Sequence, residues 1–235
     1  MRIVNDENKI QKYIEKFEID SFFEEDMSPY MKLYYFDKGE NILTAGEQIT
    51  TFYFIVEGKA KIFNLLENGK SLLLRFAKPL SDLGSVELLN EDKIIKSNVQ
   101  ALHEVIIIGI DFEVLKKHAE DDVKFLKYIV RSLSFKLFTI SNASAINLSY
   151  PFENRFASYI LSVYSDFMVD NKPERVGEIM TTNLTELATL LGVSYRHLNR
   201  VIKEFEAKGL IKKTKKGFII LDFDKLEELS GGIYE

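Results

Sequence analysis

The spacing of apolar residues changes along this chain, and each change predicts a different kind of element. Over residues 6–27 the apolar positions recur at helical intervals, which predicts one or two short helices before Pro29. From residue 33 to residue 110 they gather in short runs separated by glycines, a pattern typical of a small antiparallel barrel. The clearest predicted strands are 52–56, 60–64, 71–76 and 105–110, with a hairpin turn at 67–70.

Two helices are predicted after the barrel, a short one at 111–120 and a long one from 121 to about 148. The apolar residues of the long helix alternate between four- and three-residue steps, and such a seam can pair with its own copy across a two-fold axis. We therefore expect a dimerisation helix. The alternative, a helix that packs only on its own barrel, stays open because the heptads are few. The expected seam residues are Leu126, Val130, Leu133, Leu137 and Ile140.

A boundary and a first capped helix follow. Pro151 marks the boundary because the residue before a proline resists helical conformation, and 152–170 then predicts another amphipathic helix. Farther on, Asn183 and Glu186 have the spacing of a capping box. The helix that they begin is ended by Gly192.

A second capped helix and a hairpin complete the pattern. Ser194 is placed to cap a basic helix at 195–208, which Gly209 ends, and apolar runs at 210–211 and 218–221 flank a lysine-rich turn. This order of elements is that of a winged helix-turn-helix, although an ordinary helix pair with a solvated charged surface is the alternative. The candidate DNA-binding residues are Ser194, Tyr195, Arg196, His197, Asn199, Arg200, Lys203, Lys215 and Lys216.

Charge is distributed unevenly along the 235 residues. The whole chain has a net charge of -5, whereas residues 191–217 hold eight basic and two acidic side chains, a local charge of +6 that leaves -11 for the rest. This asymmetry favours contact between the C-terminal part and a polyanion, while the body of the protein is repelled.

Composition argues against several other functions. The chain has no cysteine, which excludes disulfides, cysteine-ligated zinc and iron–sulfur clusters. Its three histidines, His103, His118 and His197, are scattered along the sequence, so we expect no metal and no cofactor. The sequence contains no recognisable catalytic motif, so we do not expect an enzyme. No apolar run approaches the ~20 residues that span a bilayer, and the first residues lack a secretory signal, so we expect a cytoplasmic protein without membrane contact.

Several short strings occur in order over the whole chain. They are Lys38-Gly39-Glu40, Ala45-Gly46-Glu47, Tyr53-Phe54-Ile55-Val56-Glu57-Gly58, Asn68-Gly69-Lys70, and Leu191-Gly192-Val193-Ser194 leading to Arg200. Taken together, they resemble the Crp/Fnr superfamily of bacterial transcription regulators, and most of all its YeiL-type branch. The resemblance implies an α+β fold in three parts. These are an N-terminal antiparallel β-roll or jelly-roll sensor domain of the cyclic-nucleotide-binding type (1–120), a dimerisation helix (121–149) and a winged helix-turn-helix DNA-binding domain (150–235).

The sensor domain departs from the members that bind cyclic AMP. Those members carry a glycine-glutamate pair for the ribose hydroxyl and an arginine-serine pair for the cyclic phosphate. Val86 stands at the glutamate position and cannot accept the hydrogen bond, although Glu87 is next to it. Lys96 stands at the arginine position and lacks the planar guanidinium that binds phosphate through two hydrogen bonds. The alternative for Lys96 is a solvated residue at an exposed strand end.

The same alignment gives the remaining pocket positions, since the two residues that meet the purine fall on Ile140 and Ser141. The resemblance therefore implies that cyclic AMP does not control this chain, and that the sensor domain is empty or binds an unidentified small effector. The candidate effector pocket is Ser85, Val86, Glu87, Lys96, Ser97, Ile140 and Ser141.

The predicted recognition helix also departs from the common form, in which an arginine-glutamate pair follows the cap serine. Tyr195 and Arg196 replace that pair, while Arg200 matches a later arginine. We expect Arg196 and Arg200 to contact guanine, His197 and Asn199 to make secondary base or phosphate contacts, and Tyr195 to meet a phosphate or a thymine methyl. A solvated surface residue is the alternative for Asn199.

These observations predict a homodimeric, sequence-specific transcription regulator. Its partners would be a double-stranded DNA operator, a second copy of the chain and, as further candidates, RNA polymerase and a small effector. The alternative is a cyclic-nucleotide or small-ligand binding module whose C-terminal domain contacts protein rather than DNA.

Overall fold

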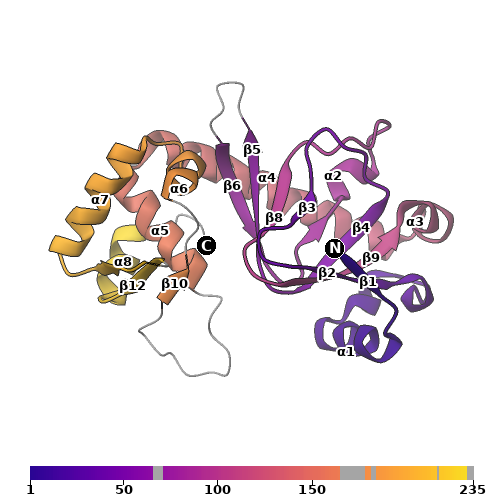
Figure 1. Cartoon of the computed structure of the whole chain (residues 1–235). Coiled ribbons are helices and arrows are strands. Elements are labelled where there is room, and N and C mark those ends of the chain that lie inside the picture. The colour runs from indigo at the N-terminus through magenta and orange to yellow at the C-terminus, as the bar shows by residue number, and fades with distance from the viewer. Residues whose placement is uncertain (66–70, 165–177, 181–183, 216, 232–235) are drawn as a thin grey trace. The chain divides into compact units, whose positions relative to one another are not determined.

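The chain forms two compact units in a computed structural model that describes residues 1–65, 71–164, 178–180, 184–215 and 217–231. One unit comprises residues 1–62 and 76–140, and the other comprises residues 63–75 and 141–235. Figure 1 shows the helices and strands of both units. The hairpin turn predicted at 67–70 lies outside the described residues, and so do Asn183 and Lys216.

Two sheets account for the strands of the N-terminal part, and the described strand pairings are antiparallel, which confirms the predicted fold class. The five-stranded sheet has the order β1-β2-β9-β4-β7, and the four-stranded sheet has the order β3-β8-β5-β6. The strands are β1 (Arg2–Val4), β2 (Lys32–Phe36), β3 (Asn41–Leu43), β4 (Thr51–Glu57), β5 (Ala60–Leu65), β6 (Ser71–Ala77), β7 (Asp82–Leu83), β8 (Asn98–Ala101) and β9 (Val105–Asp111).

The core of this part lies on β9, which pairs with β2 on one side and with β4 on the other. The strand is a continuous apolar run, and all its residues except Asp111 are buried. Phe52 and Phe54 of β4 are fully buried beside it, with their ring centroids 5.0 Å apart. Gly58, which follows β4, has a φ of 78°, and a Cβ there would lie 2.1 Å from the backbone oxygen of Glu104. Only glycine fits this turn.

Helices surround these sheets and lead into the long helix α4. Asp111 caps α3 by accepting a hydrogen bond from the amide of Glu113 at 2.9 Å, so the predicted short helix begins where the strand ends. Phe22 stacks on Tyr128 of α4 with ring centroids 4.3 Å apart. The elements are α1 (Glu7–Phe17), the 3-10 turns η1 (Ile19–Phe22) and η2 (Ser28–Tyr30), α2 (Ser85–Leu88), α3 (Phe112–Ala119) and α4 (Val123–Ser149).

The C-terminal elements form a helical domain with a three-stranded sheet of order β10-β12-β11 (Figure 1). Its core contains the fully buried Phe156, whose ring centroid lies 5.4 Å from that of Phe205 and 5.7 Å from that of Phe218. The elements are α5 (Phe152–Tyr164), β10 (Glu178–Met180), α6 (Leu184–Leu190), α7 (Tyr195–Ala207), β11 (Ile211–Lys213), β12 (Gly217–Ile220) and α8 (Phe223–Ser230).

Candidate nucleic-acid interface and sensor pocket

The turn between α6 and α7 is built by two residues. Gly192 adopts a φ of 71°, and its amide donates to the carbonyl of Thr189 at 3.0 Å, which closes α6. The hydroxyl of Ser194 accepts a hydrogen bond from the amide of His197 at 3.2 Å and so starts α7. The buried face of α7 consists of Leu198, Val201, Ile202 and Phe205.

The opposite face of α7 is open to solvent and carries the predicted contact residues. Ser194, Tyr195, Arg196, Arg200 and Lys203 are exposed, and Asn199 is half-buried. His197 is also half-buried, because its ring packs against Phe152 with the two centroids 5.0 Å apart. This face therefore presents long donors from a rigid helix, as contact with base edges and phosphates requires.

Two carboxylates lie within ion-pair distance of Arg200. Its Nη1 lies 2.9 Å from Oε1 of Glu204, one helical turn along α7, and its Nη2 lies 3.6 Å from Oε1 of Glu153 on α5. The pair with Glu204 has an i, i+4 spacing that the sequence displays, whereas the contact with Glu153 arises only from the fold.

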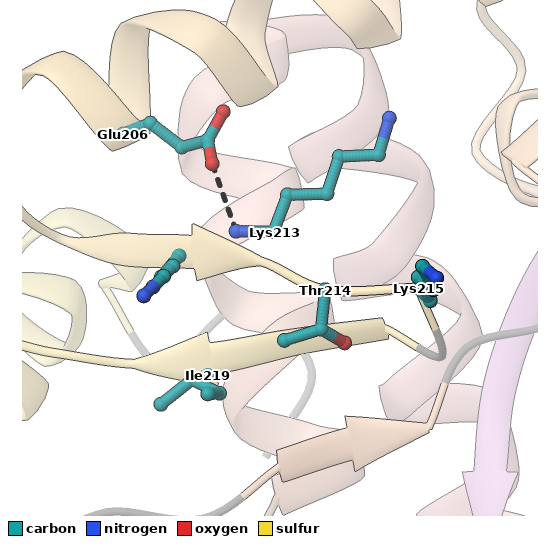
Figure 2. Close-up of a pocket in the computed structure, with 6 residues that line it drawn as sticks. Glu206, Lys213, Thr214, Lys215 and Ile219 are labelled. Atoms are coloured by element: carbon teal, nitrogen blue, oxygen red, sulfur yellow. Dashed lines mark hydrogen bonds between the residues drawn. The ribbon is translucent and has the colours of Figure 1, made fainter.

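The wing is a short hairpin of β11 and β12 with its lysines on the surface. The backbone amide of Lys213 donates to Oε1 of Glu206 at 2.9 Å, as Figure 2 shows, which fixes the hairpin to the end of α7. Thr214 closes the turn, because its hydroxyl accepts from the amide of Gly217 at 2.9 Å. The exposed lysines among the described residues of this hairpin are Lys212, Lys213 and Lys215.

In the N-terminal part, the first three predicted pocket residues lie in a short helix, α2. Gly84, with a φ of 98°, starts the single turn of α2. Ser85 is completely buried and Glu87 is buried, while Val86 is 44% exposed. The helical turn thus directs Glu87 inward and Val86 outward.

Among the described contacts, none joins the other predicted pocket residues to Ser85. Lys96 is exposed, and its ammonium lies 2.9 Å from Oδ2 of Asp92. Ser97 is half-buried. Ile140 and Ser141 are exposed on α4.

A buried polar cluster occupies the space between Ser85 and α4. The Nζ of Lys136 lies 2.5 Å from Oδ2 of Asp82 and 2.5 Å from Oγ of Ser85. Ser132 donates to Oδ1 of Asp82. The side chains of Lys136 and Asp82 are only 9% and 3% exposed.

The charges of this cluster stabilise one another. Burial acts to raise the pKa of Asp82, but the ammonium of Lys136 and the surrounding hydrogen bonds hold that pKa below its ordinary value. Burial, and the charge of Asp82, raise the pKa of the Tyr128 hydroxyl. The sequence gives no local sign of this cluster, because Asp82 and Lys136 are far apart in the chain and only the fold joins them.

The predicted seam of α4 lies on its outer side. Phe125, Ile129 and Lys136 face inward and are buried. The seam residues are mostly open: Leu126, Val130, Leu137 and Ile140 are exposed, and Leu133 is half-buried. A protomer that is alone therefore leaves this row of apolar side chains in water.

The described residues contain neither a membrane-spanning helix nor a metal-binding cluster. None of the described helices is long and apolar enough to cross a membrane. Within the same residues, no group of three or more histidine, aspartate or glutamate side chains is arranged to hold a metal ion.

The chain matches two domain families and resembles known regulators over most of its length. Residues 34–122 match the cyclic nucleotide-binding domain, and residues 154–229 match the Crp-like helix-turn-helix domain. The regulatory protein YeiL of Escherichia coli O157:H7 is 28% identical over 205 residues, which cover 87% of this chain and 88% of that protein. A CRP-like cAMP-activated global transcriptional regulator of Mycobacterium tuberculosis is 24% identical over 193 residues, 81% of this chain and 84% of its own.

Solved structures share the fold. A CRP-family transcriptional regulator from Thermus thermophilus superposes with a TM-score of 0.70 at 22% identity, over 86% of this chain and 98% of its own. The curated relatives are transcription regulators and not enzymes. With a cyclic-nucleotide-binding type of domain followed by a Crp-like helix-turn-helix, the chain belongs to the Crp/Fnr family of DNA-binding transcription regulators.

Proposed function

We propose that this regulator acts as a homodimer that reads two half-sites of an operator with its two α7 helices, and that cyclic AMP is not its effector. The observation that carries the proposal is the exposed basic face of α7, which Ser194 caps and which the buried residues of the same helix hold rigidly. In this geometry the N-terminal residues of the helix contact base edges.

Within that face, Arg196 and Arg200 are the candidates for guanine, because a guanidinium can donate two hydrogen bonds to the O6 and N7 atoms of one base. Tyr195, His197 and Asn199 are secondary contacts. Ser194, Lys203 and the wing lysines Lys215 and Lys216 contact phosphates, which contribute affinity and position but carry no sequence information.

The dimer is supported by the exposed apolar row of α4. Leu126, Val130, Leu137 and Ile140 recur at the spacing of a coiled-coil seam, and such a row is stabilised when a second copy covers it. Helix-turn-helix dimers read half-sites about 34 Å apart, one turn of DNA, and the proposed dimer would read its operator with the same spacing. RNA polymerase is a further candidate partner.

The argument against cyclic AMP rests on the chemistry at the pocket positions. Val86 points outward and offers no acceptor for a ribose hydroxyl, and Lys96 pairs with Asp92 on the surface. Lys136 instead places an ammonium against Ser85, and its charge is already balanced by Asp82. The M. tuberculosis relative is activated by cAMP, but the residues here do not favour that ligand.

The test is a gel shift on a duplex that the protein itself selects from a random pool. Arg200→Ala should weaken binding to that duplex by ten- to a hundredfold or so, the cost of about 1–3 kcal/mol for losing a bidentate base contact. Lys225→Ala removes a similarly exposed cation from α8 and should leave binding unchanged. Equal binding by the wild type and Arg200→Ala would refute the assignment of α7.

The salt dependence of the same binding separates the two candidate functions. A DNA-binding regulator loses affinity steeply as salt rises, because each phosphate contact releases counterions. A module whose C-terminal domain contacts protein would show ligand binding without such DNA affinity. Added cyclic AMP should change neither the affinity for the selected duplex nor the melting temperature, since a ligand that binds the folded state must raise the latter.

A further inference from the structure

Asp82 and Lys136 form a buried ion pair, which is unusual in a protein interior. Removing an ammonium and a carboxylate from water costs several kcal/mol per ion, and the cost is offset only when geometry and hydrogen bonds are good. Here the carboxylate receives hydrogen bonds from Lys136 and Ser132, while the ammonium also reaches Ser85. A well-packed apolar group could fill the same volume without that cost, so stability alone does not account for the pair.

The position of the Asp82–Lys136 cluster in the fold indicates its role better than its effect on stability does. Asp82 begins β7 at the edge of the five-stranded sheet, and Ser85 opens α2 three residues later. Tyr128, Ser132 and Lys136 stand at successive turns on one side of α4. The cluster therefore joins the middle of α4 to the sensor domain at the start of the segment where cyclic-nucleotide binders would hold the ribose.

The same stretch of α4 also carries the exposed seam. Leu133 and Leu137 lie directly beside Ser132 and Lys136 in sequence, on the neighbouring side of the helix. A rotation or a slide of α4 that broke the pair would also displace the seam. The pair constrains both more than apolar contacts would, because a buried ion pair offsets its desolvation cost only when its geometry is good.

From this placement we infer that the Asp82–Lys136 ion pair is an internal substitute for an effector. The side chain of Lys136 makes, from within the chain, the link between α4 and the sensor domain that a bound ligand would otherwise make. Asp82 and Lys136 are thus positioning residues for DNA binding, and the DNA-competent arrangement of α4 forms without a ligand. The inference rests on the proposed function, since it concerns how the two recognition helices are held.

The test removes the Asp82 carboxylate by substitution and then supplies a carboxylate from solution as formate. Asp82→Ala should lower affinity for the selected duplex about tenfold or more, at a temperature where circular dichroism shows the variant folded. Formate, which is small enough for the vacated space, should restore most of this loss, whereas chloride at equal ionic strength should not. A role in folding alone would not produce recovery of DNA affinity in a protein that is already folded.

The matched control is Asp92→Ala, which breaks the exposed pair with Lys96 in the same domain. It should leave DNA affinity unchanged with or without formate, because exposed pairs contribute little. If Asp82→Ala binds DNA like the wild type, or if it loses affinity and formate recovers nothing beyond the chloride control, the inference is overturned.

A second variant serves if Asp82→Ala does not fold. The double variant Asp82→Asn with Lys136→Met replaces the pair by uncharged groups of similar size, and it should fold yet bind the duplex about tenfold more weakly. Wild-type affinity in this double variant would overturn the inference. Failure of the proposed function looks different, because the wild type would then select no duplex at all.

Discussion

Replacing one seam residue, Leu137, should weaken the proposed dimer without unfolding the protomer. Leu137→Ala removes groups worth about 2.4 kcal/mol on complete burial, at about 0.8 kcal/mol for each methylene. Leu137 is 69% exposed in the protomer, so burial at an interface can contribute about 1.7 kcal/mol of this free energy. A two-fold interface contains the residue twice, once from each protomer, so the substitution removes this contribution twice. The expected loss is about 3 kcal/mol, or roughly two orders of magnitude in the dimer Kd.

Sedimentation equilibrium over a range of concentrations measures that Kd directly. Phe135→Ala is the matched control, since Phe135 is 59% exposed on the same helix but lies about 200° around it from Leu137. It should leave the dimer Kd unchanged. The reasoning is refuted if Leu137→Ala dimerises like the wild type, or if Phe135→Ala weakens the dimer as much, which would place the interface on another face of α4.

Three further predictions concern single residues. Ser194→Ala should lower the free energy of unfolding by about 1 kcal/mol, and Ser194→Gly by only a few tenths, in urea titrations, because glycine substitutes well for a cap. The folded-state pKa of Asp82 is lowered, so its contribution to stability is present above the unfolded pKa of about 3.9 and is lost as pH falls through the folded value. Asp82→Asn should therefore lose less free energy of unfolding between pH 6 and pH 3 than the wild type. An equal loss in the two proteins would contradict this. Lys215→Ala should weaken binding alike on selected and unrelated duplexes and reduce the salt slope by about 1, and a loss confined to the selected duplex would assign Lys215 to base contact.

Two elements with strong local signals were predictable from the sequence. Ser194, Gly192 and the apolar steps of α7 lie within one short stretch, so their pattern determines the helix, its cap and the turn before it. The run at 105–110 similarly indicated β9, because a short, continuously apolar run rich in β-branched residues is typical of a strand covered on both faces.

Elements that depend on distant partners were missed. β10 is three residues long and exists through its pairing with β12, in a region whose sequence is polar. α8 was also missed, although its cap was visible in sequence: Asp222 accepts from the amide of Lys225 at 3.1 Å. The Asp82–Lys136 pair has no local signal at all, since a lysine on a helix is usually exposed.

The central claim, a two-fold dimer that reads DNA through α7, is tested most directly by the sequence that the protein selects from a pool of random duplexes. The account predicts an inverted repeat whose half-site centres are about 10 base pairs apart, with guanines at positions where Arg200→Ala loses its preference. An enriched sequence without two-fold symmetry, or no enrichment at low salt, would contradict it.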